Sequence, residues 1–219
     1  MLYWYYNFIA IYILIAGLLG AWKWNTLEKS HWKHFSIYLI IIGLVQTLGI
    51  FLIKYDLNNV NNLIVDYGVI PFEFFFIYYL YYKEAETTFA KNLSIISAIG
   101  YVLSFAIQLL LLRSKSTYAF FSFSYLMGNI FLASIILTYF WNLILSNKIL
   151  DFKKERMFWV SFGMLIFWLG TLPFFGLYNY LFSNFRPIFS FYYKIMFILN
   201  YVMYSFFIYS FIWIKKKNS

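Results

Sequence analysis

The stretch LIVDYGVIPFEFFFIYYLYY, residues 63–82, is almost entirely apolar and is as long as a bilayer is thick. About 20 apolar residues in a helix cross about 30 Å of hydrocarbon. The stretch nevertheless contains Asp66, Pro71 and Glu73. Carboxyl groups at membrane depth are costly, and a proline inside a helix leaves a backbone carbonyl without its donor. The stretch therefore predicts a membrane-spanning helix with a polar, irregular region that neighbouring helices must compensate.

The composition of the whole chain favours the same environment. Of its 219 residues 63% are hydrophobic, 26% are aromatic and only 11% are charged. A soluble domain has about a quarter of its residues charged, so lipid must surround most of this chain. Cysteine is absent, which excludes disulfides, thiolate nucleophiles and Cys-based metal sites. No catalytic triad, HExxH, P-loop or dinucleotide-binding motif is present. The sequence thus predicts neither an enzyme nor a bound cofactor.

Apolar stretches long enough to span a bilayer occur seven times, separated by short polar connections. The predicted fold is therefore all-α: a polytopic membrane protein with a single transmembrane domain, residues 1–219. Of the 17 Lys and Arg residues, 12 lie in connections on one side and 5 on the other. Because basic residues collect in cytoplasmic loops, the N-terminus is predicted outside and the C-terminus inside. The predicted helices are 2–21, 35–53, 63–82, 93–112, 120–145, 158–181 and 192–214.

An ungapped shift of 127 residues superposes the second and third stretches on the sixth and seventh. Gly43 then falls on Gly170, Gly49 on Gly176, and Glu73 on Asn200. One interpretation is a parallel repeat of three helices, one linking helix and three more, as many transporters have. The other is a chance match between apolar helices, and the sequence leaves both open.

Three segments carry a resemblance: IPFEFFFIYYLYYK, ERMFWVSFGMLIFWLGTL and KIMFILNYVMYSFFIYSFIW. They contain Pro-x-Glu, Phe-Trp-x3-Gly and Leu-Asn-x3-Tyr, and the chain resembles a group of small, uncharacterised seven-helix membrane proteins of Bacteroidetes-type bacteria. The resemblance implies a multi-pass protein of the bacterial inner membrane, encoded beside signalling genes. The three-one-three layout is also similar to that of SWEET-type sugar transporters, in architecture only. The matching residues are Pro71, Glu73, Phe158, Trp159, Gly163, Leu199, Asn200 and Tyr204.

Polar groups on the third and seventh predicted helices lie at matching depths, because both helices enter from the outer side. Asp66 and Lys194 each lie about one turn in, while Glu73 and Asn200 lie about 10 Å deeper at 1.5 Å per residue. We therefore expect Asp66 and Lys194 to form a charge pair near the outer surface. Glu73 and Asn200 are expected to share a polar site near mid-membrane.

Glu73 has two interpretations. It either hydrogen-bonds to a neighbouring helix and holds the bundle together, or it forms part of a ligand, proton or cation site. Pro71 and Pro173 are predicted helix kinks, each freeing a carbonyl. Further candidates for the same ligand site are predicted at buried depth, and each is also explained by interhelical hydrogen bonding or packing. These are Gln46, Asn129, Trp168 and Tyr204.

Other polar features have simpler explanations. His31 and His34 lie three residues apart, but no third ligand is evident beyond Glu28, so an interfacial loop is favoured and no metal site is predicted. The basic patch 153–156 and the KKKNS tail indicate topology and contact with anionic lipid headgroups at the cytoplasmic face. The net charge of +9 then requires no nucleic-acid partner. Gly163 and Gly170 share a helix face, which predicts close helix packing.

The functional prediction is a membrane receptor or sensor. It would bind a small or lipidic ligand in a polar mid-membrane pocket and act through a separate signalling protein. The alternative is a small-solute or ion transporter or channel that uses the same polar residues. A structural subunit of a larger complex is a further possibility. The sequence identifies neither the ligand nor the oligomeric state.

Overall fold

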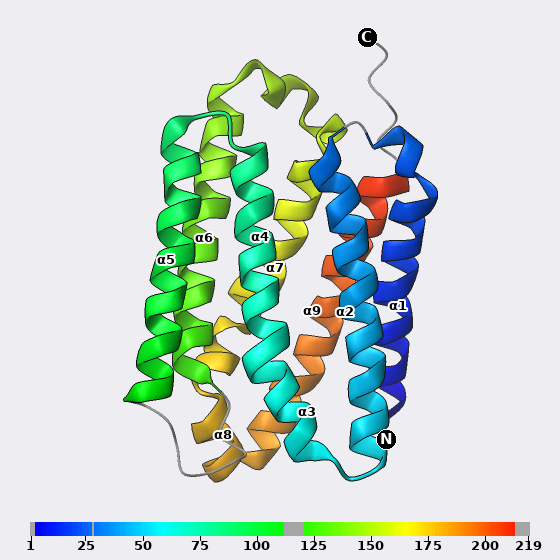
Figure 1. Ribbon diagram of the computed structural model, residues 1–219, viewed down its shortest axis with the longest axis vertical. Coiled ribbons are helices and arrows are strands. Elements are labelled where there is room, and N and C mark those ends of the chain that lie inside the picture. Colours follow the sequence, from blue (N-terminus) through cyan, green and yellow to red (C-terminus); the bar gives the residue numbers. More distant parts are fainter. Residues whose placement is uncertain (1–2, 28, 112–120, 213–219) are drawn as a thin grey trace.

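The computed structural model describes residues 3–27, 29–111 and 121–212, and within these ranges the chain is helical with no β-strand. Short 3-10 helices η1 (Trp24–Thr26) and η3 (Asn147–Lys154) occupy two of the connections. The remaining elements form a bundle (Figure 1). They are α1 (Tyr3–Trp22), α2 (Ser30–Lys54), α3 (Asn58–Ile64), the π-helical η2 (Val65–Val69), α4 (Ile70–Glu84), α5 (Thr88–Leu110), α6 (Ser122–Leu145), α7 (Arg156–Gly176), α8 (Tyr178–Asn184) and α9 (Arg186–Ile212).

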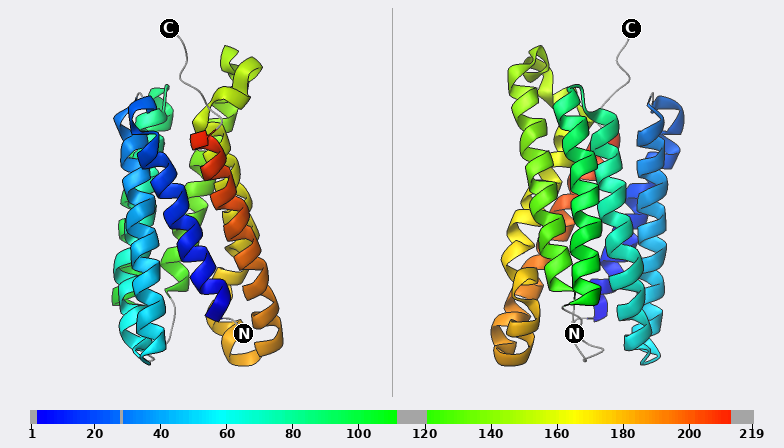
Figure 2. Two further views of the ribbon diagram at one scale, coloured as in Figure 1. Left: turned by 90° about the vertical axis from the view of Figure 1, so that its right-hand side faces the viewer. Right: turned by 60° about the vertical axis from the view of Figure 1, so that its left-hand side comes forward.

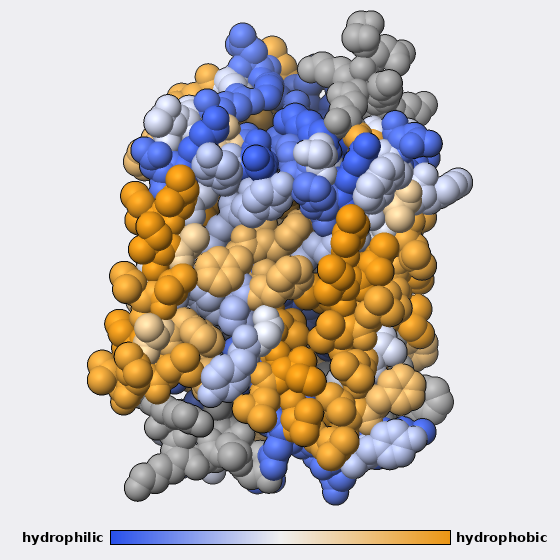
Figure 3. All heavy atoms as spheres, in the orientation of Figure 1, coloured by the Kyte–Doolittle hydropathy of each residue, from blue (hydrophilic) through white to orange (hydrophobic). Residues whose placement is uncertain are grey.

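Six helical runs are long and apolar enough to cross a membrane: α2, the run Asn58–Glu84, α5, α6, α7 and α9. A shorter apolar helix, Phe8–Trp22, accompanies them. Large apolar side chains face outward along these helices, and in the view of Figure 3 they cover the flanks while hydrophilic residues gather at the two ends, most densely at the upper one. Outward apolar surface of this extent requires lipid around it. The chain is a multi-pass helical membrane protein.

The helices overlap each of the predicted stretches, and α2, the run Asn58–Glu84, α5 and α9 begin five or six residues before the predicted limits. The predicted limits at residues 2, 112, 120 and 214 lie outside the described part of the chain. The sixth stretch differs, because α7 ends at Gly176 rather than at residue 181. Leu177 leaves the helical conformation (φ −104°, ψ 11°), and α8 begins after it as a separate short helix.

The long helices follow one another around the bundle in chain order. α1 packs against α2 and α9, α5 lies between α4 and α6, and α7 lies between α6 and α9. Figure 2 shows the same arrangement from two further sides. α7 and α9 pack together extensively, whereas the backbones of α2 and α4 come close at only a few positions. The 127-residue shift superposes these two pairs, so their unequal packing gives the repeat no support.

Small residues allow the tight α7–α9 contact. A Cβ atom on Gly163 would lie 3.1 Å from the carbonyl oxygen of Met203, and one on Gly170 would lie 2.6 Å from Cδ1 of Leu199. At Gly163 the neighbouring atom belongs to the backbone, so α7 and α9 approach this closely there because the position is a glycine. At Gly170 the neighbouring atom is the end of the flexible Leu199 side chain, which can move aside. The predicted packing role is therefore confirmed for Gly163.

The run Asn58–Glu84 is continuous but not α-helical throughout. The π-helical turn η2 lies directly before Pro71, which is the second residue of α4. A proline has no N–H for the carbonyl four residues earlier, and a wider turn accommodates that loss. The irregularity predicted at Pro71 is thus a π-turn that holds Asp66. Pro173 lies inside α7, one turn before the helix ends.

We name the two ends of the bundle for reference. The basic end is where α2 begins and α4 ends, with the lysines of the connecting segments around it. The α3 end is where α2 ends and α3 begins, and α8 lies there too (Figure 1). Aromatic side chains fill the interior between the two ends. Among them, Tyr38 of α2 stacks on Phe76 of α4 with ring centroids 4.2 Å apart.

Candidate ligand-binding cavity

A cavity of about 310 Å³ lies inside the bundle. Its walls come mainly from α2, the run α3–η2–α4, α7 and α9, and it extends from the α3 end toward mid-depth. Its volume is at the lower end of the range for small-molecule sites. The lining residues that matter below are Tyr38, Gln46, Asn61, Asn62, Asp66, Glu73, Tyr125, Trp168, Phe175, Tyr178, Tyr193, Asn200 and Tyr204.

Most of the side chains predicted from the sequence to form a ligand site line this one cavity. Glu73 and Asn200 face it from α4 and α9, as their matching depths suggested. Gln46, Trp168 and Tyr204 line it as well, from α2, α7 and α9. Asn129 is the exception: it is buried in α6, with 1% of its surface exposed, and does not belong to the lining.

The predicted charge pair between Asp66 and Lys194 is absent from the described part of the chain. Asp66 is 92% buried and lines the cavity, whereas Lys194 is exposed. The residues of α9 that reach the cavity are spaced three and four apart, and Lys194 lies between them in sequence, on another face of the helix. Depth alone was therefore an insufficient guide, because it does not fix the direction of a side chain.

Glu73 and Asn200, which were expected to share a polar site, line the same cavity but do not hydrogen-bond to each other. The amide nitrogen of Asn200 donates to the carbonyl oxygen of Met196, 3.0 Å away on its own helix. The carboxyl group of Glu73 is therefore available to a third group.

Several polar side chains in the lining have no hydrogen-bond partner among the described residues, and three of them matter most here. Asp66 and Glu73 make neither a hydrogen bond nor an ion pair, and the buried indole nitrogen of Trp168 has no acceptor. An unsatisfied buried polar group costs about 1–3 kcal/mol, and more when it is charged. Such groups gather where a ligand or water completes their hydrogen bonds.

The π-turn contributes to the cavity directly. Asp66 lies within η2, and Glu73 lies in the first turn of α4. Val69 and Ile77 line the cavity together with these two acids, so one face of the run faces inward. A π-turn adds one residue to the helix and rotates what precedes it, which is why such turns are often found at functional sites.

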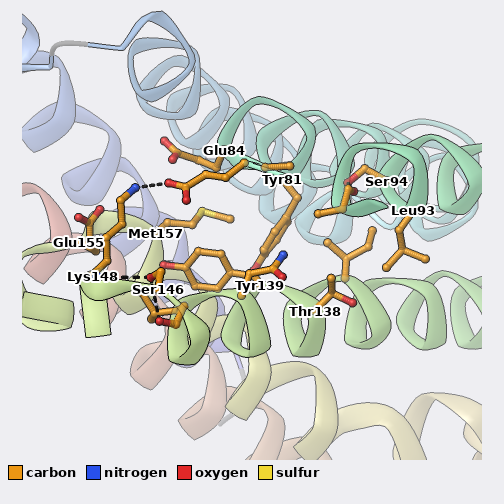
Figure 4. Close-up of a pocket in the computed structure, with 16 residues that line it drawn as sticks. Tyr81, Glu84, Leu93, Ser94, Thr138, Tyr139, Ser146, Lys148, Glu155 and Met157 are labelled. Atoms are coloured by element: carbon orange, nitrogen blue, oxygen red, sulfur yellow. Dashed lines mark hydrogen bonds and ion pairs between the residues drawn. The ribbon is translucent and has the colours of Figure 1, made fainter. Parts of the chain in front are cut away.

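A second, smaller hollow of about 50 Å³ lies at the basic end, between α4, α5, α6 and η3 (Figure 4). Lys148 and Glu155 lie at one end of it and Leu93 and Ser94 at the other. Lys148 forms an ion pair with Glu86, and this hydrogen bond raises the pKa of the Lys148 ammonium group. The volume suits about one or two waters, so it does not compete with the central cavity as a ligand site.

Glu84 forms a contact that sequence reasoning missed. Its carboxylate accepts hydrogen bonds from Nζ of Lys29 at 2.9 Å, Nε2 of His31 at 2.5 Å and Nε1 of Trp32 at 2.9 Å. This joins the start of α2 to the end of α4. Glu84 is an acidic residue among basic ones near the end of a predicted membrane-spanning stretch, which suggests an ion pair. The sequence alone does not identify the residues that pair with it.

The histidines do not form a metal site in the described part of the chain. His31 binds Glu84, and Nδ1 of His34 lies 3.0 Å from the hydroxyl of Tyr79. No group of three His, Cys, Asp or Glu side chains there is arranged to hold a metal ion. Glu28 lies outside the described residues.

Comparison of the chain with protein-family models, curated proteins and solved structures finds no match.

Proposed function

We propose that this protein is an integral membrane receptor or sensor that binds a small ligand in the central cavity and acts through a separate protein. One observation carries the proposal. Two carboxyl groups, Asp66 and Glu73, face a cavity of about 310 Å³ without any hydrogen-bond partner among the described residues. Ionisable groups at membrane depth are retained for function far more often than for packing.

Contacts at the basic end support a signalling role. Glu84 joins α2 to α4, the hydroxyl of Tyr81 donates to Oγ of Ser161 in α7 at 2.7 Å, and Arg156 donates to a carbonyl of α9 at 3.3 Å. The cavity walls and these contacts belong to the same helices. A ligand that shifts α4 against α2 at the α3 end would therefore also change the relative positions of these helices at the basic end, where a partner protein would bind.

The proposed topology has seven membrane-spanning helices, namely the six long apolar runs and the shorter helix α1. The basic end then faces the cytoplasm of a bacterial cell, where its lysines contact anionic lipid headgroups. The cavity is reached from the outer side. The resemblance to small seven-helix proteins encoded beside signalling genes fits this arrangement.

A transporter is the second candidate, and the π-turn favours it. Irregular backbone beside membrane-embedded polar groups is typical of transporter substrate sites, because half-helix ends and freed carbonyls coordinate the substrate there. In η2 and the first turn of α4, this irregular backbone carries both unpartnered acids. Under this proposal the structure is open toward the α3 end and closed at the basic end.

A cavity-filling variant tests the receptor proposal. Asn200→Trp places a large ring in the cavity, and Leu103→Trp, at an outward-facing position of α5, is the matched control. Cells that carry Asn200→Trp should reproduce the transcriptional changes of a deletion strain at normal membrane abundance, whereas Leu103→Trp should not. Normal signalling by Asn200→Trp would contradict the proposal. Movement of protons or solutes by the wild-type protein in liposomes, stopped by Asn200→Trp alone, would favour the transporter.

A further inference from the structure

The charge balance of the cavity indicates the chemistry of its ligand. Among the described residues that line it, two are acidic and none is Lys, Arg or His. Lys194, the nearest candidate for a counter-charge by sequence, is directed elsewhere and exposed. A positive group entering the cavity would meet two carboxyl groups that no protein cation neutralises.

The walls are suited to an organic cation. Aromatic rings form much of the lining, and Tyr125 lies between Trp168 at 5.6 Å and Phe175 at 4.4 Å, measured between ring centroids. Ring faces attract ammonium groups, most strongly where water is excluded. The lining rings are Tyr38, Tyr125, Phe167, Trp168, Phe175, Tyr178, Tyr193, Tyr204 and Phe207.

A metal ion fits the same cavity poorly. Asp66 and Glu73 are seven residues apart on one helical run, which separates them by about 10 Å along its axis at 1.5 Å per residue. Hard metal ions need several oxygen atoms within about 2.0–2.6 Å of one point. The two acids therefore cannot share one metal ion, but each can bind its own amine group.

We propose that the cavity binds a small organic amine cation, with Asp66 and Glu73 as its counter-charges and the aromatic rings as its walls. The separation of the two acids favours a molecule with two amine groups. This inference rests on the proposed function, because it names the ligand class of the same cavity. Amides at both ends of the cavity, Asn61 and Asn200 among them, supply further polar contacts.

The absence of cysteine allows a direct test. A cysteine introduced by Asn200→Cys would face the cavity, and Asn58→Cys, at an exposed position near the α3 end, is the control. Each variant is treated in proteoliposomes with a cationic trimethylammonium-ethyl and an anionic sulfonatoethyl methanethiosulfonate. After normalisation to Asn58→Cys, the cationic reagent should react about tenfold faster at Asn200→Cys, as expected for a charged cleft. Asp66→Asn combined with Glu73→Gln should remove that preference.

Ligand protection gives the second measurement. 1,6-Diaminohexane should slow the labelling of Asn200→Cys, whereas 1,6-hexanediol, of the same length and uncharged, should not. Gln46→Cys, at a lining position of α2, repeats both measurements if Asn200→Cys does not fold. Equal rates with both reagents, or equal protection by diamine and diol, would overturn the amine inference but leave the ligand cavity standing. No labelling at either cavity position, while Asn58→Cys reacts, would overturn the cavity and the inference together.

Discussion

Nε2 of His31, at the start of α2, lies 2.5 Å from the carboxylate of Glu84, the last residue of α4. His31 is 95% buried, and the same carboxylate also accepts from Trp32 and Lys29. Because a carboxylate only accepts, the facing imidazole nitrogen must carry a proton. The backbones of α2 and α4 come close at few other positions, so this contact sets their spacing together with the ring contacts of Tyr38 with Phe76 and of His34 with Tyr79.

Glu84→Gln should therefore lower the free energy of unfolding markedly. The variant keeps the shape of the side chain but loses the charge that three donors share. Breaking a largely buried pair of this kind costs about 3 kcal/mol. Thermal unfolding of the purified protein in detergent measures the effect. Glu86→Gln is the control, because its pair with Lys148 is exposed and is worth less than about 1 kcal/mol. Equal stability of the two variants would contradict the expectation.

The glycines of the bundle give a second pair of variants. Gly163→Ala would place a Cβ 3.0 Å from Cβ of Phe206 and 3.1 Å from the carbonyl oxygen of Met203, so α7 and α9 must separate. We expect a loss of about 1–3 kcal/mol. Gly68→Ala meets nothing within 4 Å and should stabilise the helix by up to about 1 kcal/mol. Denaturation of both variants in the same detergent is the check, and a reversed order of stability would refute the packing argument.

The buried hydrogen bond from Tyr81 to Ser161 should contribute about 0.5–1.5 kcal/mol. It joins α4 to α7, and both side chains are buried. Tyr81→Phe, Ser161→Ala and the double variant form a cycle that isolates the pairwise energy. We expect the double variant to lose less stability than the two single variants together. Strict additivity would show that the two hydroxyl groups do not interact.

Sequence reasoning reached the helices and most of the cavity for a physical reason. Apolar length predicts membrane crossing, and relative depth follows from the helical rise, so Glu73 and Asn200 were predicted at similar depths, and both line the cavity. The sequence-based predictions were wrong or incomplete where they depended on the direction of a side chain or on a contact between residues distant in sequence. Lys194 lies on another face of α9, and Asn129 is buried within the bundle without lining the cavity. The Lys29, His31 and Trp32 contacts with Glu84 join segments more than 50 residues apart.

Glu73→Leu should make the empty protein more stable. The carboxyl group has no partner among the described residues, and an acid at membrane depth costs about 2–3 kcal/mol relative to an apolar side chain. A rise in melting temperature, combined with loss of the diamine protection described above, is the expected result. This combination is typical of a residue retained for binding rather than for folding. A fall in melting temperature would instead identify Glu73 as a structural hydrogen-bonder.

Pro71→Ala should turn Asp66 further onto the face of the helical run that carries Glu73. The alanine supplies the N–H that proline lacks, so the π-turn η2 can become ordinary α-helix. Removing the extra residue of a π-turn rotates the preceding segment by about 100°, the angle of one residue in an α-helix. Residues seven apart share a face of an α-helix, so Asp66 and Glu73 would then face the cavity together. In the Asn200→Cys background, the preference for the cationic thiol reagent should therefore rise above the wild-type value.

Pro187→Ala is the matched control for this last variant. Pro187 is exposed in the first turn of α9, where a helix needs no N–H. The reagent preference should therefore stay at the wild-type value. An unchanged preference in Pro71→Ala as well would show that the π-turn does not set the direction of Asp66. Loss of the increase when Asp66→Asn is added to Pro71→Ala would establish that the rotation of Asp66 is the cause.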